Sequence, residues 1–169
     1  YGYVYPKNIE VMASSKLLVP DIADRAAFAF DDAGHHALTS GYAVTLKESL
    51  REKYEYVLGL LNSKLLSSYL KRISTPMRGG FFRYFTQYIE QLPIRTIDFA
   101  DPADVARHDQ MVALVARMLA LHRQRQIART PQEQNVLQAQ IEATDRQIDR
   151  LVYALYGLTA EEIGVVEGG

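Results

Sequence analysis

The chain has 169 residues, of which 48% are hydrophobic and 23% are charged, a composition typical of a soluble globular protein and not of a disordered one. The absence of cysteine excludes disulfides and thiolate chemistry and favours a cytoplasmic location. No run of residues approaches the ~20 apolar positions of a membrane span, and Tyr1 does not open a secretory signal. A chain that begins at tyrosine instead predicts a piece of a longer protein.

The first third of the chain predicts short β-strands that form a small mixed sheet. Pro20 ends one of the strand-prone runs, because proline cannot donate a hydrogen bond to a β-ladder. Ser40-Gly41 leads into the clearest of the strands. The runs predicted as strands lie at residues 9–11, 17–19, 26–30 and 42–46.

Two histidines follow a turn sequence in this region. Asp31-Asp32-Ala33-Gly34 is typical of a turn, since the carboxylates accept from nearby backbone N–H groups and glycine tolerates a positive φ. His35 and His36, beside these carboxylates, raise the hypothesis of a metal site or a general base. Neighbouring residues of a strand point to opposite faces, and no further ligand stands at helical spacing. A polar hairpin tip is the favoured interpretation.

The central stretch has helical periodicity over residues 52–61 and again over residues 64–73. Asn62 or Ser63 is expected to cap the second helix, and Pro76 is expected to end it. Gly79-Gly80 then permits a backbone conformation, or a close approach, that other residues would forbid.

Residues 56–89 contain no acidic side chain, although the rest of the chain is net acidic. Cations displace counterions from phosphates, and loop amides can reach phosphate oxygens, so this stretch suits nucleic acid. A solvated helix face beside a core of aromatic side chains is the alternative, and charge alone leaves both open. The candidate DNA-binding residues are Lys64, Lys71, Arg72, Arg78, Gly79, Gly80 and Arg83.

The last part of the chain predicts an antiparallel α-helical hairpin. A polar junction at residues 98–102 suggests a boundary between a domain at residues 1–97 and helices at residues 98–169. One helix is expected from about residue 103 to residue 128. Thr130 then starts a second helix with a capping box, and Gly157 ends it before a last short helix.

Several motifs together resemble the TaqI-like C-terminal specificity domains of adenine-specific DNA methyltransferases and Type IIG restriction–modification enzymes. The most specific are Leu60-Leu61-Asn62-Ser63-Lys64-Leu65-Leu66 and Leu92-Pro93-Ile94. Two weaker motifs precede them, Lys16-Leu17-Leu18-Val19-Pro20-Asp21 and Phe30-Asp31-Asp32-Ala33-Gly34. The resemblance covers roughly residues 7–97 and implies an α+β target recognition domain that binds double-stranded DNA.

The resemblance also implies a methyltransferase domain in the same parent chain, which would supply the chemistry with S-adenosylmethionine and Mg²⁺. Within these 169 residues the Asn/Asp-Pro-Pro-Tyr/Phe motif, a glycine-rich S-adenosylmethionine loop and a P-loop are missing. We therefore expect this segment to be non-catalytic and to hold no cofactor. One alternative is an interaction module that forms a homodimer through its helices, and another is an enzyme fragment that uses His35 and His36.

Overall fold

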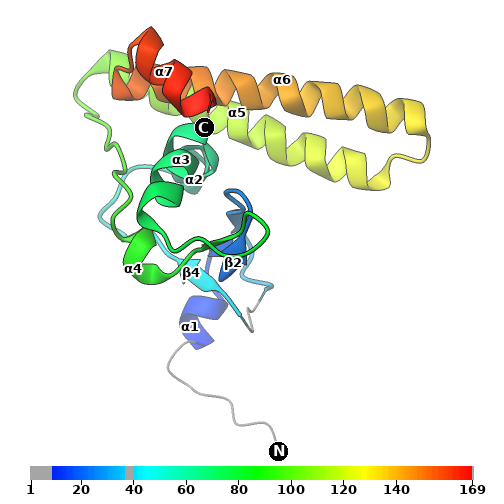
Figure 1. Ribbon diagram of the computed structural model, residues 1–169, viewed down its shortest axis with the longest axis horizontal. Helices are drawn as coiled ribbons and strands as arrows, with labels where there is room; N and C mark the ends of the chain where they lie inside the picture. The colour runs from blue at the N-terminus through cyan, green and yellow to red at the C-terminus, as the bar shows by residue number, and fades with distance from the viewer. Residues whose placement is uncertain (1–8, 37–39, 169) are drawn as a thin grey trace, which may run out of the picture.

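The computed structural model describes residues 9–36 and 40–168. Figure 1 shows a lobe of short strands and helices, with a long helical hairpin that lies across it and projects to one side. The predicted α+β class and C-terminal hairpin are confirmed. The elements are α1 (Ile9–Met12), β1 (Lys16–Val19), β2 (Ile22–Ala23), β3 (Ala29–Asp31), β4 (Tyr42–Val44), α2 (Tyr54–Asn62), α3 (Lys64–Ile73), β5 (Phe82–Arg83), α4 (Thr86–Ile89), α5 (Pro102–Ile127), α6 (Pro131–Tyr156) and α7 (Ala160–Glu167).

The strands form two small sheets rather than one mixed sheet, and every pairing in the described residues is antiparallel. β1 is the centre of a three-stranded sheet in the order β3-β1-β4, where Leu17 lies opposite both Phe30 and Val44. β2 pairs with β5, which is distant in sequence, through Ile22 opposite Arg83. This second pairing fixes the segment between α3 and α4 against the sheet lobe.

The strand predicted at residues 9–11 is wrong, because the helical turn α1 occupies these positions. Side-chain donors satisfy carbonyls at the end of this turn. Ser14 Oγ donates to the carbonyl of Val11 at 2.9 Å, and Lys16 Nζ donates to that of Met12 at 2.6 Å. The β-branched residues of this short run therefore do not decide its conformation.

Helix α2 is enclosed on all sides, since every residue from Tyr56 to Leu61 is buried. It packs against α5 on one side and against β1 and β3 on the other, as expected for a helix that is apolar all round. Gly59 allows the close approach to α5. A Cβ atom at this position would lie 2.5 Å from Met111 Sδ and 2.9 Å from Val115 Cγ2.

Ser63 separates α2 from α3, as predicted. Its hydroxyl caps α3 by accepting from the amide of Leu66 at 3.3 Å. Asp149 of α6 also contributes to this end of the helix, because its Oδ1 accepts from the amide of Lys64 at 2.9 Å. The start of α3 is thus fixed both locally and by the hairpin.

The hairpin helices have the predicted caps. Thr130 and Glu133 form a reciprocal capping box at the start of α6, with proline at the first helical position. Gly157 ends α6 in the left-handed conformation with a φ of 66°. A second capping box, between Thr159 and Glu162, starts α7. These local signals explain why the hairpin could be read from the sequence.

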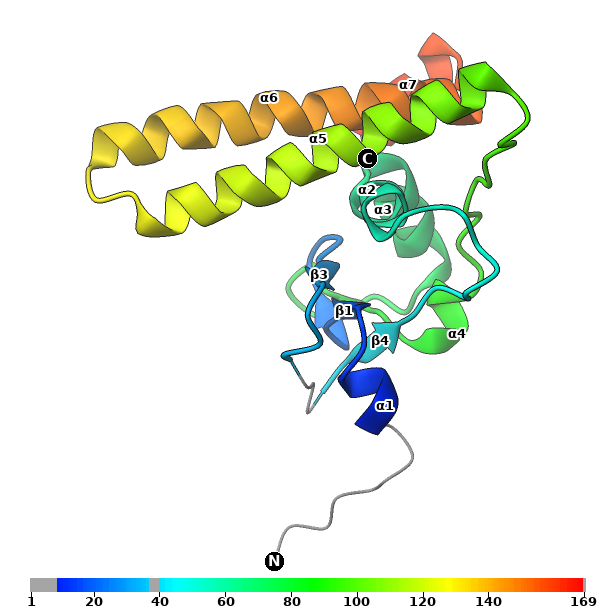
Figure 2. The same cartoon turned by 180° about the vertical axis from the view of Figure 1, so that it is seen from behind.

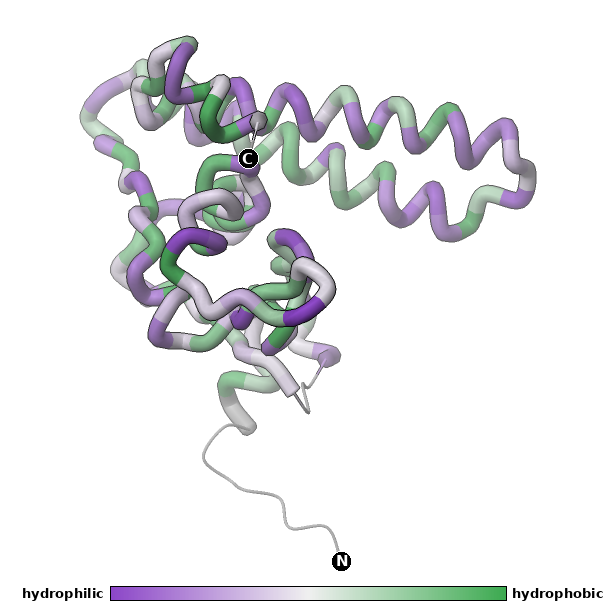
Figure 3. Tube along the Cα trace, in the orientation of Figure 1, coloured by the Kyte–Doolittle hydropathy of each residue, from purple (hydrophilic) through white to green (hydrophobic). Residues whose placement is uncertain are grey.

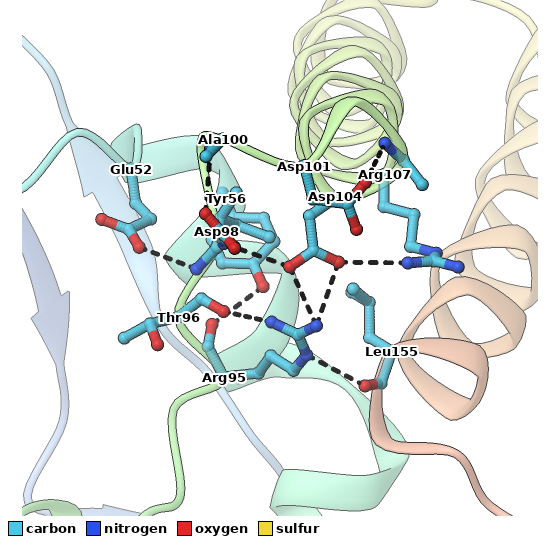
Figure 4. Close-up of polar contacts among 12 residues, drawn as sticks. Glu52, Tyr56, Arg95, Thr96, Asp98, Ala100, Asp101, Asp104, Arg107 and Leu155 are labelled. Carbon is cyan, nitrogen blue, oxygen red and sulfur yellow. Dashed lines mark hydrogen bonds and ion pairs between the residues drawn. The ribbon is translucent and has the colours of Figure 1, made fainter.

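A buried carboxylate fastens the chain segment before α5 to the hairpin (Figure 4). Both oxygens of Asp104 accept from the Arg95 guanidinium, at 3.0 and 2.9 Å, and Asp104 also accepts from the amide of Asp98 at 3.1 Å and from Arg107 at 3.0 Å. Arg95 in turn donates to the carbonyl of Leu155 in α6 at 3.2 Å. Asp104 and Arg95 therefore tie the segment before α5 to both helices of the hairpin.

This carboxylate predicts a specific dependence of stability on pH. The Asp98 amide, followed by the Arg95 guanidinium, holds the pKa of Asp104 below its ordinary value. Because the folded-state pKa is lowered, the stabilisation is complete above the unfolded pKa of about 3.9 and is lost as the pH falls through the folded pKa. Asp104→Asn should lower the free energy of unfolding at about pH 6 and lower it much less at about pH 3. Urea unfolding at both pH values measures this difference, and an equal loss at both would contradict the role given to Asp104.

Candidate nucleic-acid interface

The segment from the end of α3 through β5 folds into a narrow loop, residues 74–83, which we call the glycine loop. The amide of Met77 donates to the carbonyl of Phe81 at 2.7 Å, and Ser74 Oγ donates to the carbonyl of Arg83 at 2.6 Å. Gly79 and Gly80 have φ angles of 82° and 79°. Both angles lie in the left-handed region, which glycine adopts without strain.

Three of the sequence-predicted cations lie at this loop without an acidic partner. Arg72 is exposed on the last turn of α3, and Arg78 is exposed in the loop. Lys71 is half-buried, with Nζ 5.6 Å from the ring centroid of Phe82. Among residues 9–36 and 40–168, no carboxylate lies within ion-pair distance of these three side chains. Their charge is therefore available to an anionic ligand.

The other two predicted cations have carboxylate partners. Lys64 lies at the far end of α3, where Nζ is 3.5 Å from Glu167 Oε1 and 3.7 Å from Asp149 Oδ2. The Arg83 guanidinium is 3.3 Å from Asp21 Oδ2, and it stacks over Phe85 at 5.0 Å from the ring centroid. The structure thus brings Lys71, Arg72, Arg78 and Arg83 to one region and places Lys64 beside α6 and α7 instead.

The aromatic side chains around the loop divide between core and surface. Tyr84 is fully buried, and burial raises the pKa of its hydroxyl to about 12. Phe81, next to the glycine pair, is 43% exposed, and Tyr69 on α3 is 40% exposed. The sequence does not single out these two side chains from the other aromatics of the stretch. Nothing in the local pattern distinguishes them, because their exposure depends on how α3 and the loop pack against the rest of the chain.

The histidine pair lies at a turn built around a buried ion pair. Lys16 Nζ is fully buried and contacts Asp31 Oδ2 at 2.6 Å, and the amides of His35 and His36 donate to the same carboxylate. The hydrogen bond from Lys16, followed by these amides, holds the pKa of Asp31 far below its ordinary range. Asp31 is thus surrounded by structural partners, which include His36 Nδ1 at 3.4 Å from its Oδ1, and both histidine side chains are exposed to solvent.

Metal-ligand clusters and membrane-spanning helices are both absent from residues 9–36 and 40–168. In this part of the chain, no three His, Cys, Asp or Glu side chains lie close enough together to hold a metal ion. None of the helices that the structure describes there combines the length and apolarity of a membrane span.

Residues 4–94 match the model of the TaqI-like C-terminal specificity domain, which covers more than half of the chain, including both sheets and the glycine loop. The chain belongs to this specificity-domain family. The specificity-domain chain is also 27% identical over 121 residues to the type II restriction enzyme and methyltransferase RM.Eco57I of Escherichia coli. The matching region is 71% of this chain and 12% of that relative, so the chain spans only a small part of its length.

Proposed function

We propose that this chain is the DNA-recognition module of a restriction–modification enzyme, and that it positions duplex DNA for adenine methylation by other domains of a longer parent chain. One observation carries the proposal. In a member of the specificity-domain family, three of the sequence-predicted cations, Lys71, Arg72 and Arg78, lack an acidic partner in the described structure and lie together at the glycine loop and the adjoining end of α3. Positive charge, loop backbone and exposed aromatic rings at one place suit a nucleic acid.

The residues of this surface would make different kinds of contact with DNA, according to their chemistry. Lys71 and Arg72 are suited to phosphates, where cations displace condensed counterions. Arg78 carries a planar guanidinium that can pair with a guanine edge or a phosphate through two hydrogen bonds. The amides of Gly79 and Gly80 donate to no acceptor among the described residues, so they can approach phosphate oxygens. Arg83 and Lys64 would contribute less, because carboxylates already neutralise them.

The chemistry of the parent enzyme is assigned to regions outside this chain. RM.Eco57I is described as both a restriction enzyme and a methyltransferase, and methyl transfer would require S-adenosylmethionine while cleavage would require Mg²⁺. This chain would contribute the choice of target and the orientation of the duplex. The methyltransferase domain of the same parent chain is therefore its proposed protein partner.

Salt dependence of duplex binding tests the proposal. Fluorescence anisotropy with a labelled duplex, at salt concentrations from about 50 to 200 mM, gives the observed binding constant as a function of salt. Three phosphate contacts predict a slope of log K against log salt of about −3, since each contact contributes about −0.9. Salt-independent binding, or no binding to any duplex by either this chain or its parent enzyme, would contradict the proposal.

A further inference from the structure

The outer part of the α5–α6 hairpin extends beyond the body of the protein. We call this part, residues 116–144, the arm; it begins where the contact of α5 with Gly59 ends at Val115. At 1.5 Å per residue, the arm reaches about 18 Å past the lobe. Inside it the helices pack along a single seam that includes the buried residues Leu121, Ile141 and Thr144. A two-helix projection of this kind exposes most of its surface.

Charge is segregated between the two helices of the arm. Residues 110–132 contain four arginines and no acidic residue, whereas the acidic side chains of the arm all belong to α6. The four arginines are exposed, and among the described residues no carboxylate lies within ion-pair distance of any of them. Figure 3 shows hydrophilic segments along this outer half of the hairpin. The arginines are Arg117, Arg123, Arg125 and Arg129.

In projection, the arm and the glycine loop extend to the same side of the strand lobe. In Figure 1 the arm projects to the right, and the loop between α3 and α4 extends to the right beneath it. Figure 2 shows the same relation from behind, and in both views α5 is the helix of the arm that is nearer the strand lobe. In both projections α5, which carries Arg117, Arg123 and Arg125, is therefore the helix of the arm on the side of the loop.

We propose that the arginines of the arm bind the phosphate backbone of duplex DNA beside the segment that the glycine loop contacts. The proposal rests on the proposed function of the loop and adds a second, sequence-independent contact. The planar guanidinium group of an arginine can pair with a phosphate through two hydrogen bonds. A reach of about 18 Å corresponds to about five base pairs along one strand. The arm would thus hold flanking DNA parallel to itself and restrict how the duplex rotates over the loop.

The first part of the test removes the charges. The triple variant Arg117→Gln, Arg123→Gln, Arg125→Gln alters exposed positions only, and circular dichroism checks its fold. Its log K against log salt slope on a labelled duplex of about 40 base pairs should be smaller than that of the unmodified chain by about 2 to 3. The control is Arg146→Gln with Arg150→Gln, which removes two exposed arginines from α6 and should change the slope by much less for each charge removed.

The second part of the test locates the DNA, and it exploits the absence of cysteine in the chain. Iron–EDTA attached to Gln126→Cys on α5 should cleave the bound duplex, whereas the same group on Ala160→Cys at the start of α7 should not. An unchanged slope for the triple variant, or no cleavage from position 126, overturns the proposal even where the loop binds DNA. If the triple variant binds DNA as tightly as the unmodified chain but binds polyglutamate more weakly, the arm contacts an acidic protein surface instead. This result would also overturn the proposal. If neither the unmodified chain nor its parent enzyme binds any duplex, the proposed function is contradicted as well.

Discussion

Gly59→Val should destabilise the protein by about 2 kcal/mol or more, because the new side chain has no room between α2 and α5. Its Cβ atom alone would lie 2.5 Å from Met111 Sδ and 2.9 Å from Val115 Cγ2. The loss exceeds the few tenths of a kcal/mol that valine gains over glycine in a helix. For a chain of this size the expected fall in Tm is about 4–8 °C, measured by thermal unfolding.

Gly164→Val is the matched control, since Gly164 also lies within a helix but a Cβ atom there meets nothing within 4 Å. Its Tm should change by about 2 °C or less. Met111→Ala combined with Gly59→Val should cost less than the sum of the two single changes, because the shorter residue makes room for valine. A Tm for Gly59→Val equal to that of the unmodified chain would contradict the packing of α2 on α5.

Arg72→Gln together with Arg78→Gln should weaken duplex binding by about 10-fold or more at physiological salt. Both guanidinium groups are exposed, and neither has a carboxylate partner in the described structure. The slope of log K against log salt should decrease by about one for each arginine that binds a phosphate in the unmodified chain. If Arg78 pairs with a base, Arg78→Gln alone should also relax the preference for one base pair by about 1–3 kcal/mol.

The Arg146→Gln, Arg150→Gln variant removes two positive charges as well, but from the surface of α6. It therefore distinguishes the effect of a local contact on duplex affinity from the effect of net charge. It should retain affinity close to that of the unmodified chain. Equal decreases in affinity for the two double variants would show that overall charge, and not the glycine loop, governs binding. Both variants alter exposed side chains only, so we expect each to keep the free energy of unfolding of the unmodified chain, which urea unfolding checks.

The sequence allowed the helices and their ends to be predicted because those signals are local. Ser63, the Thr130–Glu133 capping box and Gly157 each act within one helical turn, and all three are found where expected. The α+β class follows from the same periodicities. The strand predicted at residues 9–11 failed, since donors from Ser14 and Lys16 close a helical turn there.

The candidate site was predictable as a cluster of charge but not as a geometry. Which cations keep a free charge depends on tertiary partners, and no local pattern reveals that Lys64 faces Glu167 or that Arg83 faces Asp21. The contacts of Asp104 with Arg95 and Asp98 likewise arise only when the segment before α5 folds onto the hairpin. Sequence alone therefore singles out the stretch but does not show which of its cations have carboxylate partners elsewhere in the chain.

Recognition of a short DNA sequence is the central property that we propose for this specificity-domain chain. Repeated selection from a pool of randomised duplexes, followed by sequencing of the bound fraction, tests it directly. The parent enzyme is selected in parallel with the chain. We predict that one short sequence becomes enriched with both proteins and that Arg78→Ala reduces the enrichment. Duplex binding without enrichment of any sequence, by the parent enzyme as well as by the chain, would contradict sequence recognition.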